Sequence, residues 1–262
     1  MILVADSGST KCDWALIKSE NEVLDFNTMG FNPFFHSEDV ITDALSASKE
    51  VIKYKDEIKY VFYYGAGSST KELKLVLHRA LSKVFSNAEF IHSDHDLVAA
   101  ALATYDGQPA ISCILGTGSN SCFYDGDIVN EEVPALGHIL GDEGSGSYFG
   151  KKLVARYAYK TLPTDIYNDF KEKYNLDKST IIENVYMKPH ANVYLASFMK
   201  FLSDKADNPY VYEMISDGFF EFLSIHVKCF KNYREVPVHF VGSVAYYFKD
   251  ILMNVCKTQD IT

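Results

Sequence analysis

The sequence predicts an α/β fold built from two related halves, and two observations support this. Each half contains an apolar run that enters a turn rich in Gly, Ser and Thr and then resumes as a second apolar run. The first instance starts at Met1 and the second at Ile111, roughly one hundred residues later. Elsewhere, short apolar runs alternate with stretches of helical periodicity, which is the pattern of a sheet covered by helices. The repeat indicates an internal duplication.

The first half, residues 1–102, is expected to form one domain. Its opening strands should pair as an antiparallel hairpin followed by a third strand. A helix is expected to start at Ser37, because Glu38 and Asp39 would stand in its first turn. The expected strands are residues 1–5, 12–16, 22–28, 60–64 and 89–92, and the expected helices are residues 37–55, 71–85 and 97–103.

The second half, residues 103–262, is expected to repeat the strand–turn–strand order and then to depart from it through a helical insertion. No low-complexity segment or long linker separates the halves, so we expect them to pack closely with a cleft between them. The expected strands are residues 111–115, 121–124, 128–132 and 238–241, and the expected helices are residues 147–159, 164–174, 191–205, 209–232 and 244–256.

The composition disfavours several classes of partner. A net charge of −10 and a pI near 5.2 in a chain of 262 residues argue against nucleic acid or an anionic membrane surface. A phosphate ligand would therefore be held by local donors and a metal. The five cysteines lack metal-ligand spacing, and no apolar run approaches membrane-span length. Together with the expected lack of a basic leader, these features favour a cytoplasmic protein with reduced thiols.

The second turn, Gly116-Thr117-Gly118-Ser119, carries the most chemical information. Both glycines are expected to adopt positive φ, so that successive amides point outward together and form a nest for an anion. The two hydroxyls add donors at the same place. A plain hairpin turn is the alternative for this stretch alone, and the recurrence of the turn favours phosphate binding.

The first turn runs from Asp6 to Lys11 and differs from the second by its carboxylate. Phosphate would repel Asp6 unless a hard cation lay between them, so Asp6 is predicted to bind Mg²⁺ through water. Lys11 is either a phosphate contact or a solvated strand residue. Neither turn has the Gly-x-x-x-x-Gly-Lys-Ser/Thr spacing of a P-loop.

Three segments together resemble a known superfamily. Asp-x-Gly-x-Thr-Lys from Asp6, Gly-Thr-Gly-Ser-Asn from Gly116 and Gly-Ser-Val-Ala from Gly242 are similar to the two phosphate loops and the adenosine loop of the actin, hexokinase and heat-shock ATPases. Gly-His-x-x-Gly-Asp-Glu-Gly-Ser, from Gly137 to Ser145, resembles the BadF/BadG/BcrA/BcrD ATPase family and its N-acetylglucosamine kinase branch. The resemblance implies two ribonuclease H-like domains, an actin-like ATPase fold with a nucleotide and sugar cleft between them, and the use of ATP with Mg²⁺.

The resemblance also assigns roles to individual residues. It implies a metal contact at Asp6 and phosphate contacts at Ser7, Gly8, Ser9, Thr10 and Lys11 in the first turn and at Gly116, Thr117, Gly118 and Ser119 in the second. Gly242 and Ser243 open a helix where they would meet the nucleoside, and a helix cap is the alternative. Family members usually continue beyond this helix, so the C-terminal domain is expected to be truncated at Thr262.

Phosphoryl transfer to a hydroxyl also requires a base that takes the hydroxyl proton. Asp94 and Asp96 both stand at the end of an expected strand. Asp96 directly precedes the small-residue helix expected at 97–103, as the family's aspartate does, and is therefore favoured as the catalytic residue and a sugar contact. Asp94 stays open as the alternative, and either residue could instead be a helix N-cap.

The resemblance implies further sugar contacts at Asn32, Leu136, Gly137 and Asp142. Asp142 and Glu143 stand at a helix start, where a carboxylate also serves as a cap, and Asp142 is favoured over Glu143 for the sugar. Eukaryotic relatives resemble Gly-Trp-Gly-His where this chain has Ala-Leu-Gly-His from Ala135. The sugar contact at this point is therefore expected to be weaker or different.

The predicted function is an ATP-dependent kinase for N-acetylglucosamine or a related amino sugar. One alternative is an ATPase that activates a partner enzyme, as relatives with a cysteine-bound iron–sulfur cluster do, although the strand positions of Cys113 and Cys122 disfavour such a cluster. The other alternative is a non-catalytic sugar or muropeptide sensor, which the presence of Asp6 and Asp96 disfavours. A small-molecule sugar is the expected partner, nucleic acid and membrane are not, and a homodimer is left open.

Overall fold

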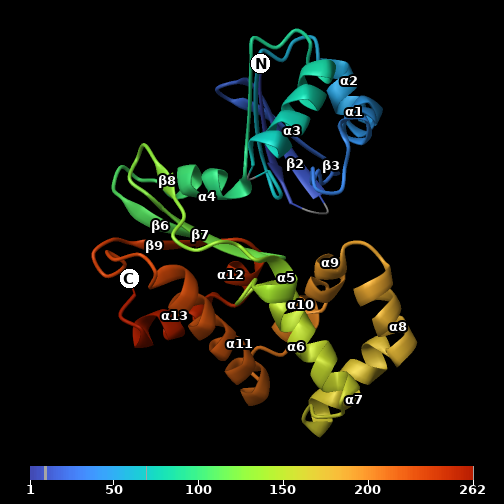
Figure 1. Ribbon diagram of the computed structural model, residues 1–262, viewed down its shortest axis with the longest axis vertical. Coiled ribbons are helices and arrows are strands. Elements are labelled where there is room, and N and C mark those ends of the chain that lie inside the picture. Colours follow the sequence, from blue (N-terminus) through green and yellow to red (C-terminus); the bar gives the residue numbers. More distant parts are fainter. Residues whose placement is uncertain (9–10, 69, 262) are drawn as a thin grey trace. The chain divides into compact units, whose positions relative to one another are not determined.

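The computed structural model describes residues 1–8, 11–68 and 70–261. The chain forms two compact units, Met1–Ala99 and Ala100–Thr262 (Figure 1). The boundary between the units lies within helix α4 (Asp96–Thr104). The domain boundary predicted after residue 102 falls in the same helix.

The first unit is built on a five-stranded sheet in the order β3-β2-β1-β4-β5. Its strands are β1 (Ile2–Ser7), β2 (Lys11–Ser19), β3 (Glu22–Met29), β4 (Tyr60–Gly65) and β5 (Phe90–Asp94). The first three strands are antiparallel, as predicted, and β4 and β5 run parallel to β1. The register aligns Asp6 with Tyr64 and Tyr64 with Asp94. Asp6 and Asp94 therefore lie in one row at the carboxyl edge of the sheet.

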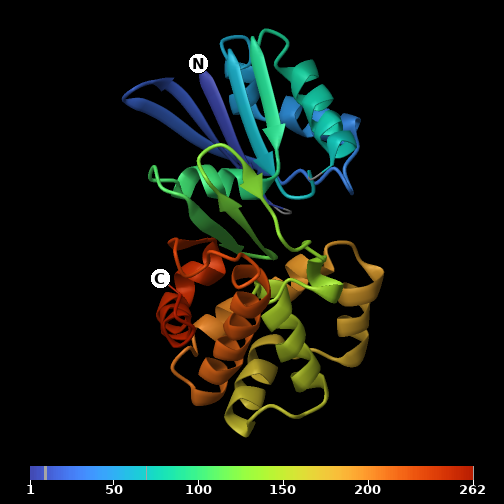
Figure 2. The same ribbon diagram turned by 60° about the vertical axis from the view of Figure 1, so that its left-hand side comes forward.

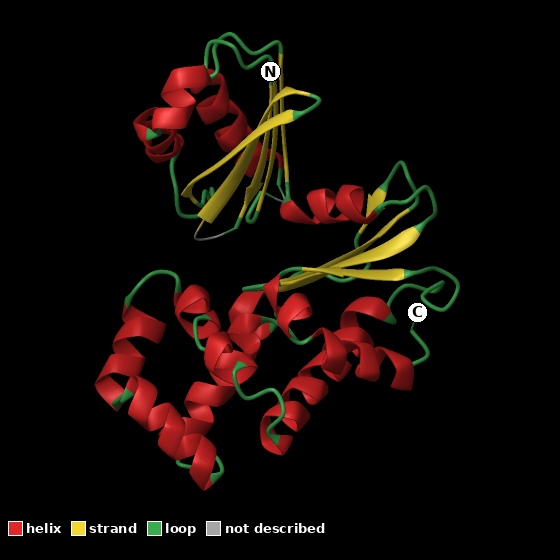
Figure 3. Ribbon diagram, turned by 180° about the vertical axis from the view of Figure 1, so that it is seen from behind, coloured by secondary structure: helices red, strands yellow, loops and turns green. Residues whose placement is uncertain are grey.

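Three helices pack on one face of this sheet (Figure 3). They are α1 (Glu38–Ala47), α2 (Lys49–Tyr54) and α3 (Lys71–Val84). The prediction of one helix over residues 37–55 is wrong, because Ser48 interrupts it. Ser48 is extended (φ −74°, ψ 126°), and its hydroxyl accepts a hydrogen bond from the Val51 amide. Serine favours such N-cap positions because its side chain competes with the helix for backbone donors.

The core of the first unit lies between these helices and the sheet. Leu3, Ala5 and Ser7 of β1 point into it, whereas Asp6 between them is exposed. This separation follows from the alternation of side chains along a strand. Trp14 of β2, which is 1% exposed, is the largest side chain in this core.

The second unit contains a four-stranded sheet in the order β8-β7-β6-β9. Its strands are β6 (Ala110–Leu115), β7 (Ser119–Tyr124), β8 (Val129–Asn130) and β9 (Val238–Val241). β6 and β7 form the predicted antiparallel hairpin, with residues 116–118 at its turn, and β9 lies parallel to β6. β8 covers two residues of the strand predicted at 128–132.

The rest of the second unit is mostly helical, and its helices from α6 onward gather on one face of the sheet (Figure 2). The helices are α5 (Gly137–Leu140), α6 (Gly146–Ala158), α7 (Thr164–Tyr174), α8 (Lys178–Ile182), α9 (Ala191–Ala196), α10 (Met199–Ser203), α11 (Pro209–Phe222), α12 (Ser243–Tyr247) and α13 (Lys249–Thr258), with π-helical turns η1 (Glu183–Met187) and η2 (Leu223–Val227). The helices predicted at 147–159 and 164–174 are confirmed. The continuous helices predicted at 191–205, 209–232 and 244–256 are wrong, because each is interrupted or ends earlier. None of the described helices is both long and apolar enough to span a bilayer.

These interruptions leave no trace in the apolar pattern. Between α12 and α13, Phe248 departs from helical geometry (φ −113°, ψ 25°) and buries its ring, which is 2% exposed. After Phe222 the chain continues as a π turn that keeps Leu223 and Val227 in the core. Buried residues on both sides of a break preserve the expected periodicity, so burial in the tertiary structure decides where each helix ends.

Helix α6 is held tightly by its neighbours. A Cβ at Gly150 would lie 1.9 Å from the Leu195 carbonyl oxygen of α9, and a Cβ at Gly218 of α11 would lie 2.3 Å from the Phe149 ring. Glycine at both positions therefore lets α9 and α11 approach α6 closely. Phe149 also meets Phe219 edge to face, with ring centroids 5.7 Å apart. This packing fixes the N-terminus of α6, against which the β6–β7 turn lies.

Candidate active site

β1 pairs with β2 as the predicted hairpin, and the end of β1 presents the Asp6 carboxylate to solvent. The Gly8 amide donates to the Lys11 carbonyl oxygen at 3.0 Å. Asp6 is exposed, and the surrounding protein, together with the Asp13 carboxylate opposite it in the register, raises the pKa of its carboxyl group. Lys11 is exposed and its Nζ lies 2.6 Å from Asp13. The predicted phosphate contacts Ser9 and Thr10 lie outside the described residues.

Ser7, the last residue of β1, is buried, unlike the exposed Asp6 and Lys11. Its side chain has no exposed area, and its hydroxyl accepts a hydrogen bond from the Phe31 amide at 3.0 Å. The Ser7 hydroxyl is therefore committed to the core of the first unit. The Ser7 carbonyl oxygen also accepts the Ala66 amide at 2.9 Å, so its backbone is engaged as well. The phosphate contact at Ser7 stays a prediction.

Asp94 is engaged by positive and polar groups. The Lys74 Nζ lies 2.5 Å from its carboxylate, and the His95 amide donates to it at 2.8 Å. The ring nitrogens of His92 and His95 lie at 3.8 Å. Burial would raise the pKa of Asp94, but the bonds from Lys74 and the His95 amide outweigh burial and lower it. Asp94 is therefore a weakly basic carboxylate.

Asp96, two residues later, stands at the first residue of α4 without an ion-pairing lysine or arginine among the described residues. Burial raises the pKa of its carboxyl group, and the negative charge of Asp6 raises it further, while His95 and the Leu97 amide oppose them. The Asp6 carboxylate therefore acts on Asp96 within the first unit. The amide contact with Leu97 also agrees with the N-cap alternative.

Asn32 lies in the turn that follows β3. It is 8% exposed, and its Oδ1 accepts a hydrogen bond from the Phe34 amide at 3.0 Å. A Cβ at Gly67, which has φ +78°, would lie 2.2 Å from the same oxygen. The side-chain oxygen is thus occupied, whereas the Nδ2 amide donates to none of the described residues and is left for a ligand.

The second turn lies on the N-terminus of α6. The amides of Gly146 and Ser147 donate to the carbonyl oxygens of Gly116 and Thr117 at 2.8 and 3.0 Å, and the Gly116 amide donates to the Gly118 carbonyl oxygen at 3.0 Å. The amides of Thr117 and Gly118 donate to none of the described residues. The prediction of positive φ at both glycines is wrong, because the helix, and not a left-handed nest, fixes which way these peptide groups face.

The two glycines of this turn meet different surroundings. A Cβ at Gly118 would lie 3.1 Å from the Asp142 Oδ1, so this position is crowded by the protein itself. A Cβ at Gly116 would meet nothing within 4 Å. The chain would accept a side chain at Gly116, and glycine there leaves open space beside the turn.

Asp142 supports the second turn from behind. It is 9% exposed with φ 60°, and it accepts hydrogen bonds from the Ser119 amide at 3.4 Å and the Ser147 hydroxyl at 3.2 Å. Burial raises the pKa of its carboxyl group, against the effect of these bonds. A non-glycine residue held at positive φ is a strained arrangement of the kind found at functional sites.

The neighbouring Glu143 is linked to a histidine that the sequence analysis missed. Its backbone oxygen accepts the Ser119 hydroxyl at 2.8 Å, and its carboxylate lies 3.2 Å from the Nε2 of His226. His226 belongs to the π turn η2 and is 3% exposed. No local motif marks it, because it reaches Glu143 from 83 residues away along the chain.

Leu136 and Gly137 lie on the surface around α5, a short helix that the sequence did not predict. Leu136 is 56% exposed, and Gly137 has φ +68°. The Gly137 carbonyl oxygen accepts the Gly141 amide at 2.8 Å, so this turn leads directly into Asp142. The Lys151 Nζ of α6 donates to the carbonyl oxygen of His138 at 2.7 Å and anchors the turn.

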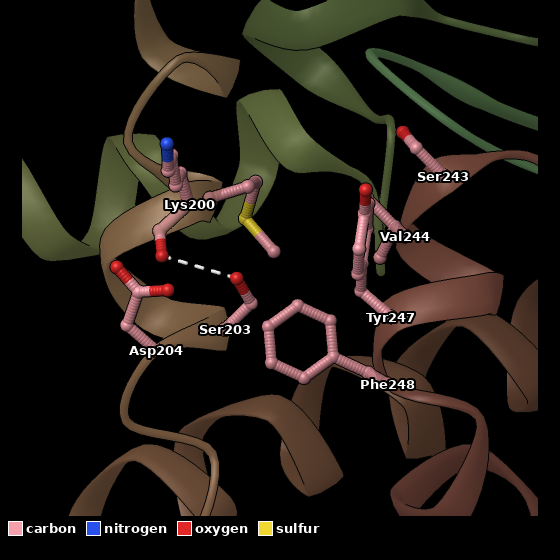
Figure 4. A pocket seen from close by; sticks show the side chains of 8 residues that line it. Lys200, Ser203, Asp204, Ser243, Val244, Tyr247 and Phe248 are labelled. Carbon is pink, nitrogen blue, oxygen red and sulfur yellow. Dashed lines mark hydrogen bonds between the residues drawn. The ribbon is translucent and has the colours of Figure 1, made fainter.

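Gly242 and Ser243 adjoin the second turn and a pocket. Gly242 has φ +106°, and a Cβ there would lie 2.4 Å from the Leu115 carbonyl oxygen. Ser243 opens α12 and lines a cavity of about 330 Å³ between α12 and α10 (Figure 4). The rings of Tyr247 and Phe248 form one wall, and the other is formed by Met199, Lys200, Ser203 and Asp204. The sequence pointed to Gly242 and Ser243 but not to these aromatic rings.

No family model matches the chain, and neither does any curated protein sequence. A crystal structure from Porphyromonas gingivalis, described as a "putative N-acetylglucosamine kinase", is 37% identical and has a TM-score of 0.94, and the match covers 100% of this chain and 93% of that one. A second such protein, from Chromobacterium violaceum, is 16% identical with a TM-score of 0.71, covering 100% and 93%. A ROK-family glucokinase from Streptomyces griseus, in complex with glucose and AMPPNP, is 16% identical with a TM-score of 0.58, covering 100% and 90%. The last two show the fold, an actin-like α/β ATPase fold, alone.

Proposed function

Because the chain belongs to the same family as the Porphyromonas gingivalis protein, a family of ATP-dependent sugar kinases in the actin and hexokinase superfamily, we propose that it phosphorylates a hydroxyl of N-acetylglucosamine or a related amino sugar. The observation that carries the mechanism is the contrast between Asp94 and Asp96. One carboxylate is neutralised by Lys74, and the other is left without such a partner near Asp6.

Asp96 acts as the general base in this proposal. It accepts the proton of the acceptor hydroxyl while the hydroxyl oxygen attacks the terminal phosphorus and ADP leaves. A pKa above the ordinary carboxylate range improves a base as long as it stays ionised at the working pH. Asp94 is unsuited to the role, because Lys74 and the His95 amide stabilise its ionised form.

Asp6 is the proposed ligand of the Mg²⁺ ion. Its exposed carboxylate supplies the oxygen donor that Mg²⁺ prefers, and Mg²⁺ usually takes few protein ligands and keeps several waters. Among the described residues no group of three or more His, Cys, Asp or Glu side chains that could hold a metal ion occurs. Mg²⁺ would neutralise charge on the transferred phosphoryl group.

Within the sugar kinases, we assign the chain to the BadF/BadG branch because of the sequence of its 137–145 segment.

The phosphates of ATP are held by backbone donors in this proposal. The amides of Thr117 and Gly118 are free to bind phosphate oxygens, and the open space at Gly116 lets a phosphate approach the chain. Gly8 and Lys11 contribute from the first turn. Backbone amides at a helix N-terminus are a common anion site, which supports the assignment in a chain whose net charge is −10.

The nucleoside of ATP occupies the cavity beside α12. A volume of about 330 Å³ lies within the usual range for small-molecule sites. The exposed Tyr247 ring offers a face to the base, the buried Phe248 ring lines the same wall, and Ser243 offers a hydroxyl to the ribose. Gly242 places α12 against β6, so the nucleoside and phosphate contacts of the second unit adjoin each other.

The sugar is contacted by the free Nδ2 amide of Asn32 and by Asp142, with Leu136 and Gly137 as backbone and apolar contacts. Asp142 already accepts two hydrogen bonds from the protein, but each carboxylate oxygen has a second lone pair for a sugar hydroxyl. The alternative of an iron–sulfur activator is disfavoured. Cys113 and Cys122 are fully buried, and burial raises the pKa of both thiols, that of Cys122 to about 12.

A coupled assay of ADP release tests the proposal. The 262-residue protein is incubated with ATP and Mg²⁺ and with N-acetylglucosamine, glucosamine, glucose or a muropeptide in turn. ADP release that depends on an amino sugar is the expected result. Turnover without any sugar would favour the activator, and binding of sugar without turnover would favour the sensor.

A further inference from the structure

The turn that carries Asn32 is tied to the sheet of the first unit by two buried side chains. The hydroxyl of Ser7, at the end of β1, accepts the Phe31 amide at 3.0 Å. The hydroxyl of Tyr63, on β4, donates to the Phe31 carbonyl oxygen at 3.1 Å. Ser7, Phe31 and Tyr63 all have 0% exposed area. Both polar groups of the Phe31 backbone are thus satisfied by side chains, in a segment that belongs to no strand or helix.

Asn32 follows Phe31 directly, and its own bonds close the turn. Its carbonyl oxygen accepts the amides of Phe35 and His36 at 2.9 Å, and its amide donates to the His36 Nδ1 at 3.2 Å. Its side-chain oxygen accepts the Phe34 amide. These bonds make the turn rigid within itself, but they do not fix it to the sheet. Ser7 and Tyr63 supply that connection.

Two glycines, one at the end of β4 and one in the loop that follows it, leave room for Tyr63 and Asn32. A Cβ at Gly65 would lie 2.7 Å from the Tyr63 ring and hydroxyl, and a Cβ at Gly67 would lie 2.2 Å from the Asn32 Oδ1. Two glycines within three positions therefore leave room for the Tyr63 side chain and the Asn32 amide. Burial raises the pKa of Tyr63, so its hydroxyl stays a neutral donor at any working pH.

We propose that Ser7 and Tyr63 are positioning residues for the acceptor sugar, which fix the Nδ2 amide of Asn32 through the Phe31 backbone without touching the sugar. The inference rests on the proposed function, in which Asn32 contacts the sugar. It gives Ser7 a role that the resemblance did not assign. It also separates sugar affinity from nucleotide affinity, because the Phe31 bonds lead to Asn32 and not to the proposed phosphate donors.

The test is Tyr63→Phe, assayed with N-acetylglucosamine, ATP and Mg²⁺. Loss of the hydroxyl leaves the Phe31 carbonyl oxygen buried without a partner, so the KM for the sugar should rise by roughly tenfold. The kcat at saturating sugar and the KM for ATP should stay within about twofold. Tyr157→Phe is the matched control, since Tyr157 is also buried (6% exposed) and donates to a backbone oxygen, that of Leu176, at 3.3 Å. It should change neither KM.

Ser7→Ala is a second test of the inference. It removes the side-chain acceptor of the Phe31 amide and leaves the backbone of residue 7 in place. It should raise the sugar KM selectively and carries the test by itself if Tyr63→Phe does not fold. A sugar KM within twofold of wild type, or an equal rise in the KM for ATP, would overturn the inference. If wild type shows no sugar-dependent turnover, or Asn32→Ala leaves the sugar KM unchanged, the proposed function fails instead.

Discussion

The two glycine turns of this chain follow the same strand–turn–strand order but use their carboxylates in opposite ways. In the first unit, Asp6 is exposed and points away from the core, near the unpaired Asp96. In the second unit, Asp142 is buried behind its turn and accepts two hydrogen bonds from the protein. A duplicated backbone motif therefore does not duplicate chemistry. The exposed Asp6 carboxylate is open to a metal ion, whereas the buried Asp142 carboxylate first holds its own turn in place.

The largest expected effect comes from Asp96, the carboxylate without an ion-pairing lysine or arginine among the described residues. Asp96→Asn keeps the shape and hydrogen bonding of the side chain but cannot accept a proton, so sugar-dependent kcat should fall by about 10²-fold or more while sugar binding changes little. Steady-state ADP release measures the first quantity, and calorimetry with the sugar measures the second. Asp94→Asn is the control and should reduce kcat far less. The reverse outcome would transfer the role of base to Asp94.

Asp6 should give the next largest effect. Asp6→Asn weakens the proposed metal contact at the end of β1, so turnover should fall by about tenfold or more at limiting Mg²⁺ and recover in part at high Mg²⁺. The melting temperature should not fall, because the pKa of Asp6 is raised in the folded state. A titration of Mg²⁺ in the ADP assay measures this. Normal activity of the variant at limiting Mg²⁺ would mean that the first turn is misassigned and that the contrast with Asp142 does not concern a metal.

Substitutions of the two glycines of the second turn should separate an effect on ATP binding from an effect on stability. Gly116→Ala meets open space at ordinary φ, so it should leave the melting temperature unchanged while it raises the KM for ATP by roughly tenfold through a clash with phosphate. Gly118→Ala would press on Asp142 and should lower the melting temperature. Thermal melts and ATP titrations on both variants check this. An unchanged KM for ATP in Gly116→Ala would argue against phosphate at this turn.

The smallest expected effect is on stability and depends on pH. The pKa of Asp96 is raised in the folded state, so its contribution to stability is present below the unfolded pKa, about 3.9, and is lost as the pH rises through the folded pKa. Asp96→Asn should therefore raise the melting temperature at pH 7 by roughly 2–4 °C, the scale of about 1 kcal/mol in a chain of this size. This gain should vanish near pH 4.

Asp94→Asn should change the melting temperature in the opposite direction to Asp96→Asn. Its pKa is lowered in the folded state, so its contribution to stability is present above the unfolded pKa and is lost as the pH falls through the folded pKa. Asp94→Asn should therefore lower the melting temperature at pH 7. Melting curves of both variants at pH 4 and pH 7 test the pair. Equal shifts of the two would contradict the assignment of one paired and one unpaired carboxylate.

The sequence predicted the strands and the two turns well, because alternating burial and glycine-rich turns are local signals. It failed where tertiary packing decides, as at Ser48 and Phe248, where a long periodic stretch is cut into two helices. In the candidate site it located the Gly116–Ser119 turn but gave the glycines the wrong φ. Nothing local could show that the peptide groups of this turn bond to α6.

Residues that reach the site from far along the chain were also beyond sequence reasoning. Tyr63 meets Phe31 across 32 positions, and His226 meets Glu143 across 83. Each looks like an ordinary core residue in its own segment. The distinction between Asp94 and Asp96 likewise needed the position of Lys74, which lies on a different element.

The contact between the second turn and α6 has an electrical consequence. Each α6 amide that donates to the turn bonds to a peptide group whose own N–H donates to none of the described residues. Gly146 bonds to the Gly116–Thr117 peptide and Ser147 to the Thr117–Gly118 peptide. Hydrogen bonds in such chains polarise one another, which strengthens each by about 10–30%. The positive end of the helix dipole is thereby relayed through two peptide units to the Thr117 and Gly118 amides. An anion bound to these two amides would therefore be attracted by the dipole of α6, although it does not contact the helix itself.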